Sequence, residues 1–304
     1  MKTVLLIHNP SAGNARHGKE EIIDLIKKTG HSIESIGYMS TEDSNAWKNS
    51  DLGMVDTIFL AGGDGTVHKL ALALLDLKKK TSTTIHLLPL GTANNIAKTL
   101  RISTVIDRHA VAREKSIKNF DCGRIKGLAE TKFFVEGVGF GVFPRLIHEM
   151  EKGHKAGDIP SVELKQALKA LLGIIKTFRA QKAIIKADGI KIKGSFLLVE
   201  VMNIQYFGPN IKLAPGADPG DGHFDLVMIP DKSRSGLEEY LIGLIGDSAE
   251  YASLEKFVKT IRVQHVKVKW SGTKMHIDDD LVDYGGGNIQ VDVLSDVLRF
   301  VKDI

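Results

Sequence analysis

The first hundred residues alternate short apolar runs with amphipathic segments. The apolar runs are typical of β-strands and fall at residues 3–9, 32–39, 56–63 and 85–91. Between them, apolar positions recur three and four apart, as on one face of a helix, at residues 19–30, 66–80 and 92–100. Strands that alternate with helices in this way form a parallel sheet covered by helices. The pattern therefore predicts an α/β domain with a Rossmann-like parallel sheet.

The pattern changes after about residue 125, where strand-like segments dominate. These segments fall at residues 131–140, 181–189, 192–203, 222–230, 260–270 and 286–294. Helical periodicity is confined to residues 143–151, 160–180 and 235–250. We therefore predict a second domain that is rich in β-structure and resembles a β-sandwich.

The segment 260–270 changes its alternation part-way along. Ile261 and Val263 place the apolar set on odd positions, whereas Val266 and Val268 place it on even positions. A β-bulge near Gln264 would explain this change, because one extra residue in the strand keeps the apolar side chains on the same face of the sheet.

These patterns divide the chain into two domains. We expect an α/β domain at residues 1–125 and a β-rich domain at residues 126–294, with residues 295–304 returning to the first domain. A length of 304 residues is sufficient for two domains, each with its own hydrophobic core. With 43% hydrophobic and 26% charged residues, the composition is typical of globular proteins.

Composition also bears on compartment and partners. The single cysteine, Cys122, permits no internal disulfide, and the N-terminal apolar run is too short for a signal sequence, so we expect a cytoplasmic protein. The net charge of +4 is dispersed, without a basic block that interleaves aromatic residues, which argues against a nucleic-acid partner. A homodimer is compatible with the sequence.

Three loops rich in small and polar residues follow predicted strands, at residues 9–14, 60–66 and 88–95. The carboxyl ends of parallel strands meet at one edge of a sheet, where ligands bind in α/β proteins. Gly62, Gly63 and Gly65 allow the backbone to approach a ligand closely, and the helix expected from about Thr66 points its N–H groups at an anion. The loops therefore predict a phosphate site, to which the third loop adds Gly91 and Asn94.

Asp64 lies among these glycines, where it would repel a phosphate directly. Its useful role is to hold a divalent cation that bridges to phosphate oxygens, which makes it a Mg²⁺ ligand. The alternative is an ordinary strand-to-helix turn in which Asp64 is the N-cap. Neither the P-loop pattern G-x-x-x-x-G-K-[ST] nor the dinucleotide-binding fingerprint occurs.

The segments "NPSAG", "GGDGT" and "LPLGTANN" together resemble the nucleotide-binding segments of the diacylglycerol kinase catalytic domain family, which includes bacterial lipid kinases and sphingosine and ceramide kinases. "GGDGT" alone is shared with NAD kinases and 6-phosphofructokinases, and "LPLGTANN" distinguishes the lipid kinases. The likeness continues through "NFDCGRI", "MNIQYFGPNIKLAPGADPGDGHFDLVMI" and "IDDDLVDY".

The resemblance implies an α/β domain of the NAD kinase and diacylglycerol kinase type that binds ATP, a β-sandwich-like second domain, and a lipid hydroxyl in the cleft between them. Carried over residue by residue, it implies ATP contacts at Asn9, Pro10, Ser11, Ala12, Gly13, Thr41, Gly63, Asp64, Gly65, Thr66, Val67, His68, Lys69 and Thr92.

The resemblance also implies roles for the acidic residues. Asp64, Asp121 and Asp280 match the cluster that organises Mg²⁺ and the attacking alcohol, with Asp280 as the base. Asp221, with backbone carbonyls near Asp218 and His223, matches a second, structural metal site.

The sequence departs from the family pattern at these acidic positions. Asp280 replaces the family's glutamate and Asp279 the preceding glycine, so that Asp278 or Asp279 could share the role of the base. Asn95 replaces an aspartate.

The expected function is ATP- and Mg²⁺-dependent phosphorylation of a diacylglycerol-like lipid hydroxyl, as a step of phospholipid metabolism. A lipid substrate places the enzyme at a membrane surface, as a peripheral protein of the inner face. Two alternatives stay open: an inactive nucleotide-binding regulator of the same fold, and a nucleotide kinase similar to NAD kinase.

Overall fold

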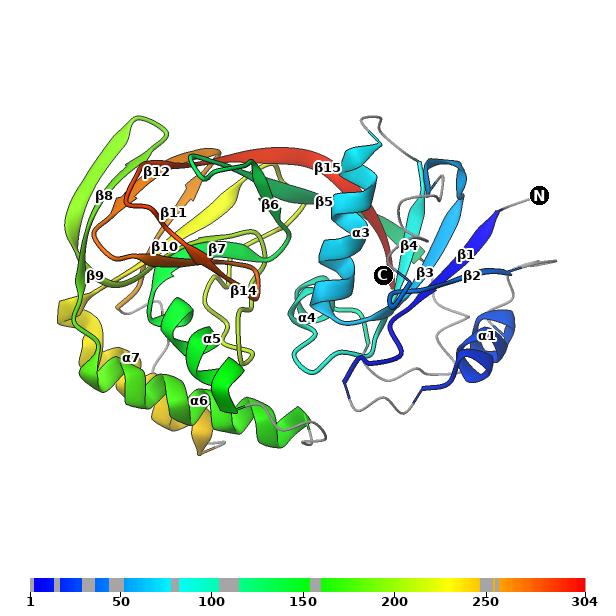
Figure 1. Cartoon of the computed structure of the whole chain (residues 1–304), viewed down its shortest axis with the longest axis horizontal. Coiled ribbons are helices and arrows are strands. Elements are labelled where there is room, and N and C mark those ends of the chain that lie inside the picture. The colour runs from blue at the N-terminus through cyan, green and yellow to red at the C-terminus, as the bar shows by residue number, and fades with distance from the viewer. Residues whose placement is uncertain are drawn as a thin grey trace. The chain divides into compact units, whose positions relative to one another are not determined.

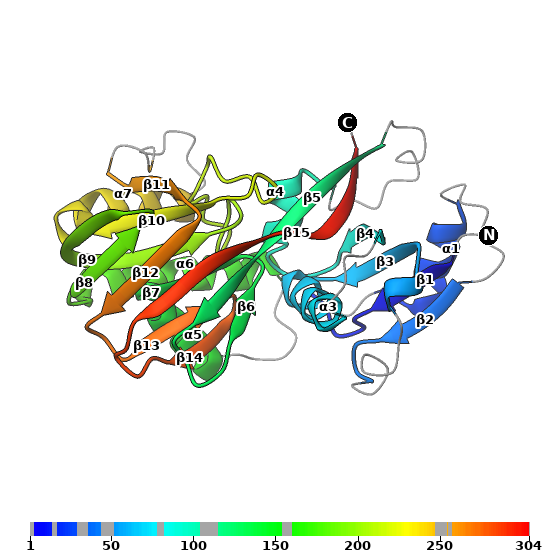
Figure 2. The ribbon, with the colours of Figure 1, turned by 90° about the horizontal axis from the view of Figure 1, so that it is seen from above.

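The chain folds into two compact units. The computed structural model describes residues 3–13, 17–28, 36–43, 52–77, 82–103, 115–153, 160–246, 254 and 257–303. The first unit comprises Met1–Asp121 with Ser295–Ile304, and the second comprises Cys122–Leu294. Strands β5 (Lys115–Lys126) and β15 (Ile289–Asp303) have residues in both units (Figures 1 and 2).

The first unit contains the predicted parallel sheet. Its strands lie in the order β4 (Thr84–Pro89), β3 (Thr57–Gly62), β1 (Val4–His8) and β2 (Ile36–Ser40). All three neighbouring pairs are parallel. The end of β15 adds a parallel contact at the other side of β4, where Phe300 pairs with Ile85. The prediction of a parallel α/β fold is confirmed.

Helices cover both faces of this sheet, as Figure 1 shows for α1 (Lys19–Lys28) and α3 (Asp64–Asp76). Ile22 and Ile26 of α1 pack against Phe59 and Ala61 of β3. Because side chains alternate along a strand, the intervening residues of β3 point to the opposite face, where α3 packs. A 3-10 turn η1 (Leu52–Met54) and the short helix α4 (Asn95–Leu100) complete the unit.

The second unit is built from antiparallel strands that form a sandwich-like arrangement. One path of paired strands runs β14 (Asp280–Asp283), β13 (Lys274–Ile277), β7 (Gly137–Gly141), β9 (Ile190–Met202), β8 (Gln181–Ala187), β12 (His265–Trp270) and β15. Strand β9 also pairs with β10 (Phe224–Pro230), which pairs with β11 (Lys259–Val263), and β6 (Lys132–Phe134) pairs with β5. Buried side chains such as Phe140 and Trp270 fill the interior of this unit.

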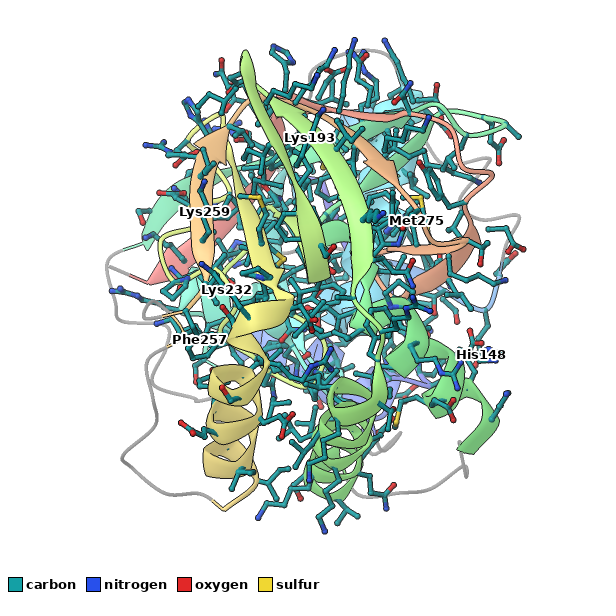
Figure 3. All side chains as sticks on the ribbon, turned by 90° about the vertical axis from the view of Figure 1, so that its left-hand side faces the viewer. His148, Lys193, Lys232, Phe257, Lys259 and Met275 are labelled. Atoms are coloured by element: carbon teal, nitrogen blue, oxygen red, sulfur yellow. The ribbon has the colours of Figure 1, made fainter. Side chains whose placement is uncertain are left out.

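Three helices pack on the sheet of the second unit: α5 (Val142–Gly153), α6 (Pro160–Thr177) and α7 (Arg234–Ile245), the last preceded by a 3-10 turn η3 (Asp231–Ser233). Figure 3 looks onto this unit and labels Phe257 beside the start of α7, where the Ser233 hydroxyl donates to the Phe257 carbonyl. Leu171 and Ile175 bury the apolar face of α6 in a core shared with β10. No helix in the described part of the chain is both long and apolar enough to span a membrane.

The change of alternation near Gln264 is a break between two strands, which corrects the predicted β-bulge. Strand β11 pairs with β10, whereas β12 pairs with β8 and β15. The N–H groups of Gln264 and His265 donate to the carboxylate of Asp188 at 2.8 and 2.9 Å. The chain therefore changes sheet partners here, and a side chain satisfies the backbone groups that leave the ladder.

Candidate functional site

Three loops meet at the carboxyl edge of the sheet in the first unit. Strands β1, β3 and β4 are adjacent and parallel, so the loops that follow them start side by side. The Asn9 amide nitrogen lies 3.3 Å from the Thr66 hydroxyl, which joins the first loop to the second. The Leu90 N–H donates to the Gly62 carbonyl at 3.0 Å, which joins the third loop to the second.

Glycine is required where the loops touch. A Cβ atom on Gly63 would lie 2.9 Å from the Gly91 Cα, and one on Gly91 would lie 2.6 Å from the Gly63 Cα. Gly13 has a φ of +59°, and its Cβ would lie 2.4 Å from the Leu90 carbonyl oxygen. Gly65 differs, because a Cβ there would meet nothing within 4 Å.

The Asp64 carboxylate binds the start of α4. Helix α3 begins at Asp64, two residues before the predicted start, and its own N-cap is Gly63. Asp64 is buried, and its Oδ2 and Oδ1 accept the N–H groups of Asn95 at 2.9 Å and Ile96 at 3.0 Å. The alternative that made Asp64 the N-cap of its own helix is therefore wrong. The carboxylate joins the second loop to the helix that follows the third.

Three of the predicted nucleotide residues use their side chains inside the protein. The Asn94 amide accepts the Gly91 N–H at 2.9 Å and donates to the Gly91 carbonyl at 2.7 Å, which closes the third loop. Val67 is fully buried, and the Thr66 hydroxyl lies under Gly62. These positions leave mainly their backbone groups for a ligand.

The other predicted nucleotide residues lie on the same loops or on α3. The Ser11 hydroxyl donates to Glu42 at 3.1 Å, and the Thr41 N–H donates to the His8 carbonyl at 2.9 Å. The remaining positions are half-buried or exposed: Pro10, Ala12, Thr92, His68 and Lys69.

Two titratable residues at this edge escaped the sequence analysis. Lys98 on α4 is half-buried, and this burial lowers its pKa although the nearby Asp64 charge acts in the opposite direction. His8 ends β1, and its pKa is lowered by burial and then by the charge of His17, against the effect of Glu42. The spacing of Lys98, one helical turn after Asn94, is the signal that would have indicated it.

The predicted acidic residue Asp121 lies in the pair of strands that join the sequences of the two units. It is 1% exposed, and its Oδ1 accepts the N–H of Asp296 at 2.9 Å. Asp296 has a φ of 59°, which is rare for a residue other than glycine. The Asp121 carboxylate therefore stabilises an unusual backbone conformation in β15.

Asp280 lies in the second unit, as the exposed first residue of β14. It pairs with Ile277 across the β13–β14 hairpin. The turn residue Asp278 is buried, and its carboxylate accepts the N–H groups of Val135, Glu136 and Gly137 at 3.0, 2.8 and 3.0 Å. Asp278 is thus committed to holding the turn, which contradicts its suggested share in the role of the base.

In the loop predicted to hold a structural metal, the polar side chains form hydrogen bonds and an ion pair within the protein. Asp221 Oδ2 lies 2.5 Å from the Arg262 guanidinium, and Asp221 Oδ1 accepts the His223 N–H at 2.9 Å. Asp218 accepts the N–H of Gly220. In this structure the Arg262 guanidinium balances the charge of Asp221, and the metal site at this loop stays a prediction.

Asp225 is a further carboxylate beside this loop that the sequence analysis missed. It is 8% exposed. Burial, and then the charge of Asp221, raise its pKa to about 6, although Arg262 acts in the opposite direction. Asp225 is the second residue of β10, directly after the loop, and this position in the sequence could have indicated it.

The fit to Mg²⁺ differs in the first unit. Across the described ranges, no three His, Cys, Asp or Glu side chains are arranged to hold a metal ion. Mg²⁺ in kinase sites is bound by one or two carboxylates together with water and substrate phosphates. Asp64 supplies a carboxylate directly after the glycines of the second loop, at the start of α3, which is the type of ligand that such a site uses.

Comparison with known proteins identifies the family. The family model for the diacylglycerol kinase catalytic domain matches residues 3–125, and that for the YegS C-terminal NAD kinase beta sandwich-like domain matches residues 155–301. Residues 3–125 belong to the diacylglycerol kinase catalytic domain family. The resemblance inferred from the three loops is thereby confirmed, and the chain is a member of a family of kinases.

Relatives of this kinase family extend over nearly the whole chain. A diacylglycerol kinase of Bacillus subtilis (strain 168) is 27% identical, covering 94% of this chain and 91% of the relative. A diacylglycerol kinase of Staphylococcus aureus (strain MRSA252) is 24% identical, covering 94% and 87%. The crystal structure of a diacylglycerol kinase from Bacillus anthracis str. Sterne matches with a TM-score of 0.68 at 19% identity, covering 98% and 96%. These likenesses confirm the predicted fold class.

Proposed function

We propose that this protein is an ATP- and Mg²⁺-dependent kinase that phosphorylates a hydroxyl group of a diacylglycerol-like lipid at a membrane surface. The observation that carries the proposal is the meeting of three loops around the Gly63–Gly91 contact in the first unit. Such an edge offers backbone N–H groups to phosphates without side-chain obstruction. The names of the relatives, diacylglycerol kinases, support the lipid acceptor.

Positioning and charge neutralisation supply most of the catalysis of phosphoryl transfer. The N-terminus of α3 and the glycines before it would bind the triphosphate, and the bond from Asp64 to α4 fixes the two loops relative to each other. Asp64 would hold Mg²⁺, which neutralises the charge of the phosphate oxygens when bound. Lys98 adds a half-buried positive charge near the same carboxylate.

Asp280 would serve as the base. As the alcohol oxygen bonds to the γ-phosphorus, the bond between that phosphorus and the ADP oxygen breaks, and the hydroxyl proton passes to the Asp280 carboxylate. The products are ADP, the phosphorylated lipid and one proton. The exposure of Asp280 at the start of β14 leaves its carboxylate accessible to such an acceptor.

A panel of acceptors tests the proposal. The purified protein is incubated with labelled ATP, Mg²⁺ and, separately, diacylglycerol, monoacylglycerol, phosphatidylglycerol, sphingosine and NAD. We expect label in a glycerolipid, and EDTA should abolish the transfer. Formation of NADP would favour a nucleotide kinase. ATP binding without turnover on any acceptor would favour a nucleotide-binding regulator. Such a regulator would be consistent with Asp279 and Asp280 in place of the family's glycine and glutamate.

A further inference from the structure

The second unit buries two titratable side chains that the proposed reaction does not use. Glu200 on β9 and His276 on β13 are both 0% exposed, and Glu200 Oε2 lies 2.8 Å from His276 Nε2. Within the described residues, the second oxygen of Glu200 is buried without a hydrogen-bond partner. Burying two ionisable groups costs free energy that apolar residues of similar size would not cost. Because apolar residues would be less costly to bury, the presence of this pair indicates a role other than stability.

The pair reaches the turn before Asp280 through one hydrogen bond. His276 Nδ1 lies 2.9 Å from the Asp278 carbonyl oxygen. A carbonyl only accepts hydrogen bonds, so Nδ1 carries a proton and Nε2 shares a second proton with Glu200. Burial alone would lower the pKa of His276, but the Glu200 carboxylate and the hydrogen bonds raise it. The bond from the Nδ1–H group to the Asp278 carbonyl does not depend on which of the two partners holds the shared proton.

The backbone of Asp278 is held from both ends. Its carbonyl accepts from His276, and its carboxylate accepts three N–H groups from residues 135–137. Its φ of 47° lies in the left-handed region that residues other than glycine rarely adopt. These bonds therefore stabilise a backbone conformation that is unfavourable for a residue other than glycine.

The surroundings of His276 fix the direction of its ring. The ring of Phe207 lies with its centroid 4.6 Å from that of His276, and the Phe143 centroid lies at 6.2 Å. On β7, a Cβ at Gly139 would lie 1.8 Å from Glu200 Oε2, so only glycine leaves room for the carboxylate. Apolar walls that exclude water strengthen the hydrogen bonds inside them.

We propose that the Glu200–His276 pair is a positioning device for Asp280: it fixes the Asp278 carbonyl, and thereby the direction in which the β13–β14 turn presents the Asp280 carboxylate. The inference rests on the proposed function, in which Asp280 receives the proton of the acceptor hydroxyl. Neither Glu200 nor His276 touches a substrate in this proposal, so both are positioning residues.

Two variants of His276 separate its two hydrogen bonds. Asparagine places an amide nitrogen where Nδ1 lies and retains the bond to Asp278, whereas glutamine reaches the place of Nε2 and retains the bond to residue 200. Both are made with Glu200→Gln, so that no unpaired charge stays buried. We expect E200Q/H276Q to lose about tenfold or more in kcat, because a small misplacement of a reacting group is costly. E200Q/H276N should stay within about threefold of E200Q.

Two further readouts distinguish positioning from general destabilisation. The Kd for ATP should be the same in all variants, because the nucleotide loops belong to the first unit. Amide hydrogen exchange at residues 279–281 should be faster in E200Q/H276Q alone. Equal kcat in the two double variants, or exchange that follows the melting temperature in both, would overturn the proposal.

The controls keep the test decisive. Gly139→Ala pushes on the Glu200 carboxylate and should lower kcat like the glutamine variant, whereas Gly173→Ala on α6, where a Cβ would meet nothing within 4 Å, should not. If the wild type phosphorylates no acceptor, the proposed function fails. In that case, hydrogen exchange at residues 279–281 still tests whether the Glu200–His276 pair holds the β13–β14 turn in place.

Discussion

At the scale of single residues, three carboxylates that were predicted as catalytic or metal-binding groups also accept hydrogen bonds from the backbone of distant segments. Asp64 accepts two N–H groups of α4, Asp278 accepts three from residues 135–137, and Asp121 accepts that of Asp296. A hydrogen bond from a backbone N–H to an ionised carboxylate is stronger than one between neutral groups. Each of these residues therefore shapes the site whether or not it also touches a ligand.

Asp64→Asn tests this dual role. The amide keeps one acceptor and turns its NH₂ group toward a buried N–H of α4, so we expect a loss of about 1–3 kcal/mol in the free energy of unfolding. Lipid phosphorylation should fall by about a hundredfold. Urea unfolding and steady-state kinetics at saturating Mg²⁺ measure both. Asp76→Asn, at the exposed end of the same helix, is the control and should change little. Unchanged phosphorylation would refute the role of Asp64.

Asp225 predicts a specific pH dependence of stability. Its pKa is raised to about 6, chiefly by burial, so the protonated form is favoured in the folded state. Its stabilising contribution is full below about pH 4 and is lost as the pH rises through 6. Asp225→Asn should therefore be about 1–2 kcal/mol more stable than the wild type at pH 7, after solvent screening, and equal to it near pH 4. Denaturant unfolding at both pH values measures this, and a less stable variant at pH 7 would contradict it.

At the scale of elements, local patterns predicted the strands and helices of the first unit and misplaced two features. Helix α3 starts at Asp64 because the carboxylate is bonded to α4 and not to its own helix. Residues 260–270 form two strands because their partners differ, which alternation alone does not reveal. Both differences arise from contacts between elements distant in sequence.

The contact between the second and third loops predicts opposite effects for two neighbouring glycines. Gly63→Ala would push a methyl group into the Gly91 backbone, so we expect a loss of about 1–3 kcal/mol in stability and weaker ATP binding. Gly65→Ala, the matched control, enters open space in the first turn of α3 and should be neutral or stabilise by up to about 1 kcal/mol. Thermal unfolding with and without ATP measures both. Equal stability of the two variants would contradict the close approach.

At the scale of the whole molecule, the candidate chemistry is divided between the two units. The nucleotide loops, Asp64 and Asp121 belong to the first, and the turn that carries Asp280 belongs to the second. Binding of ATP and transfer of its phosphoryl group should therefore respond to different substitutions.

Asp280→Asn tests this division. Removing a general base costs about 10²–10⁴-fold in rate, so kcat should fall by at least a hundredfold while the Kd for ATP stays unchanged. Kinetics and isothermal titration calorimetry measure the two quantities. Asp283→Asn, on the same strand, is the control, since the exposed Asp283 pairs only with Lys274 in the described contacts. Lower ATP affinity with normal kcat would place the base elsewhere.

Sequence by itself determined the alternation of strands and helices, the parallel sheet, the change to β-structure and the three loops that indicated the family. These are short-range properties, written in periodicity and in glycine and asparagine at strand ends. Only the tertiary structure decided which groups each carboxylate binds. Asp64 reaches 31 residues along the chain, and Asp278 reaches 143 residues back to Val135. No local pattern encodes such partners, because they depend on how the completed sheets bring distant backbone together.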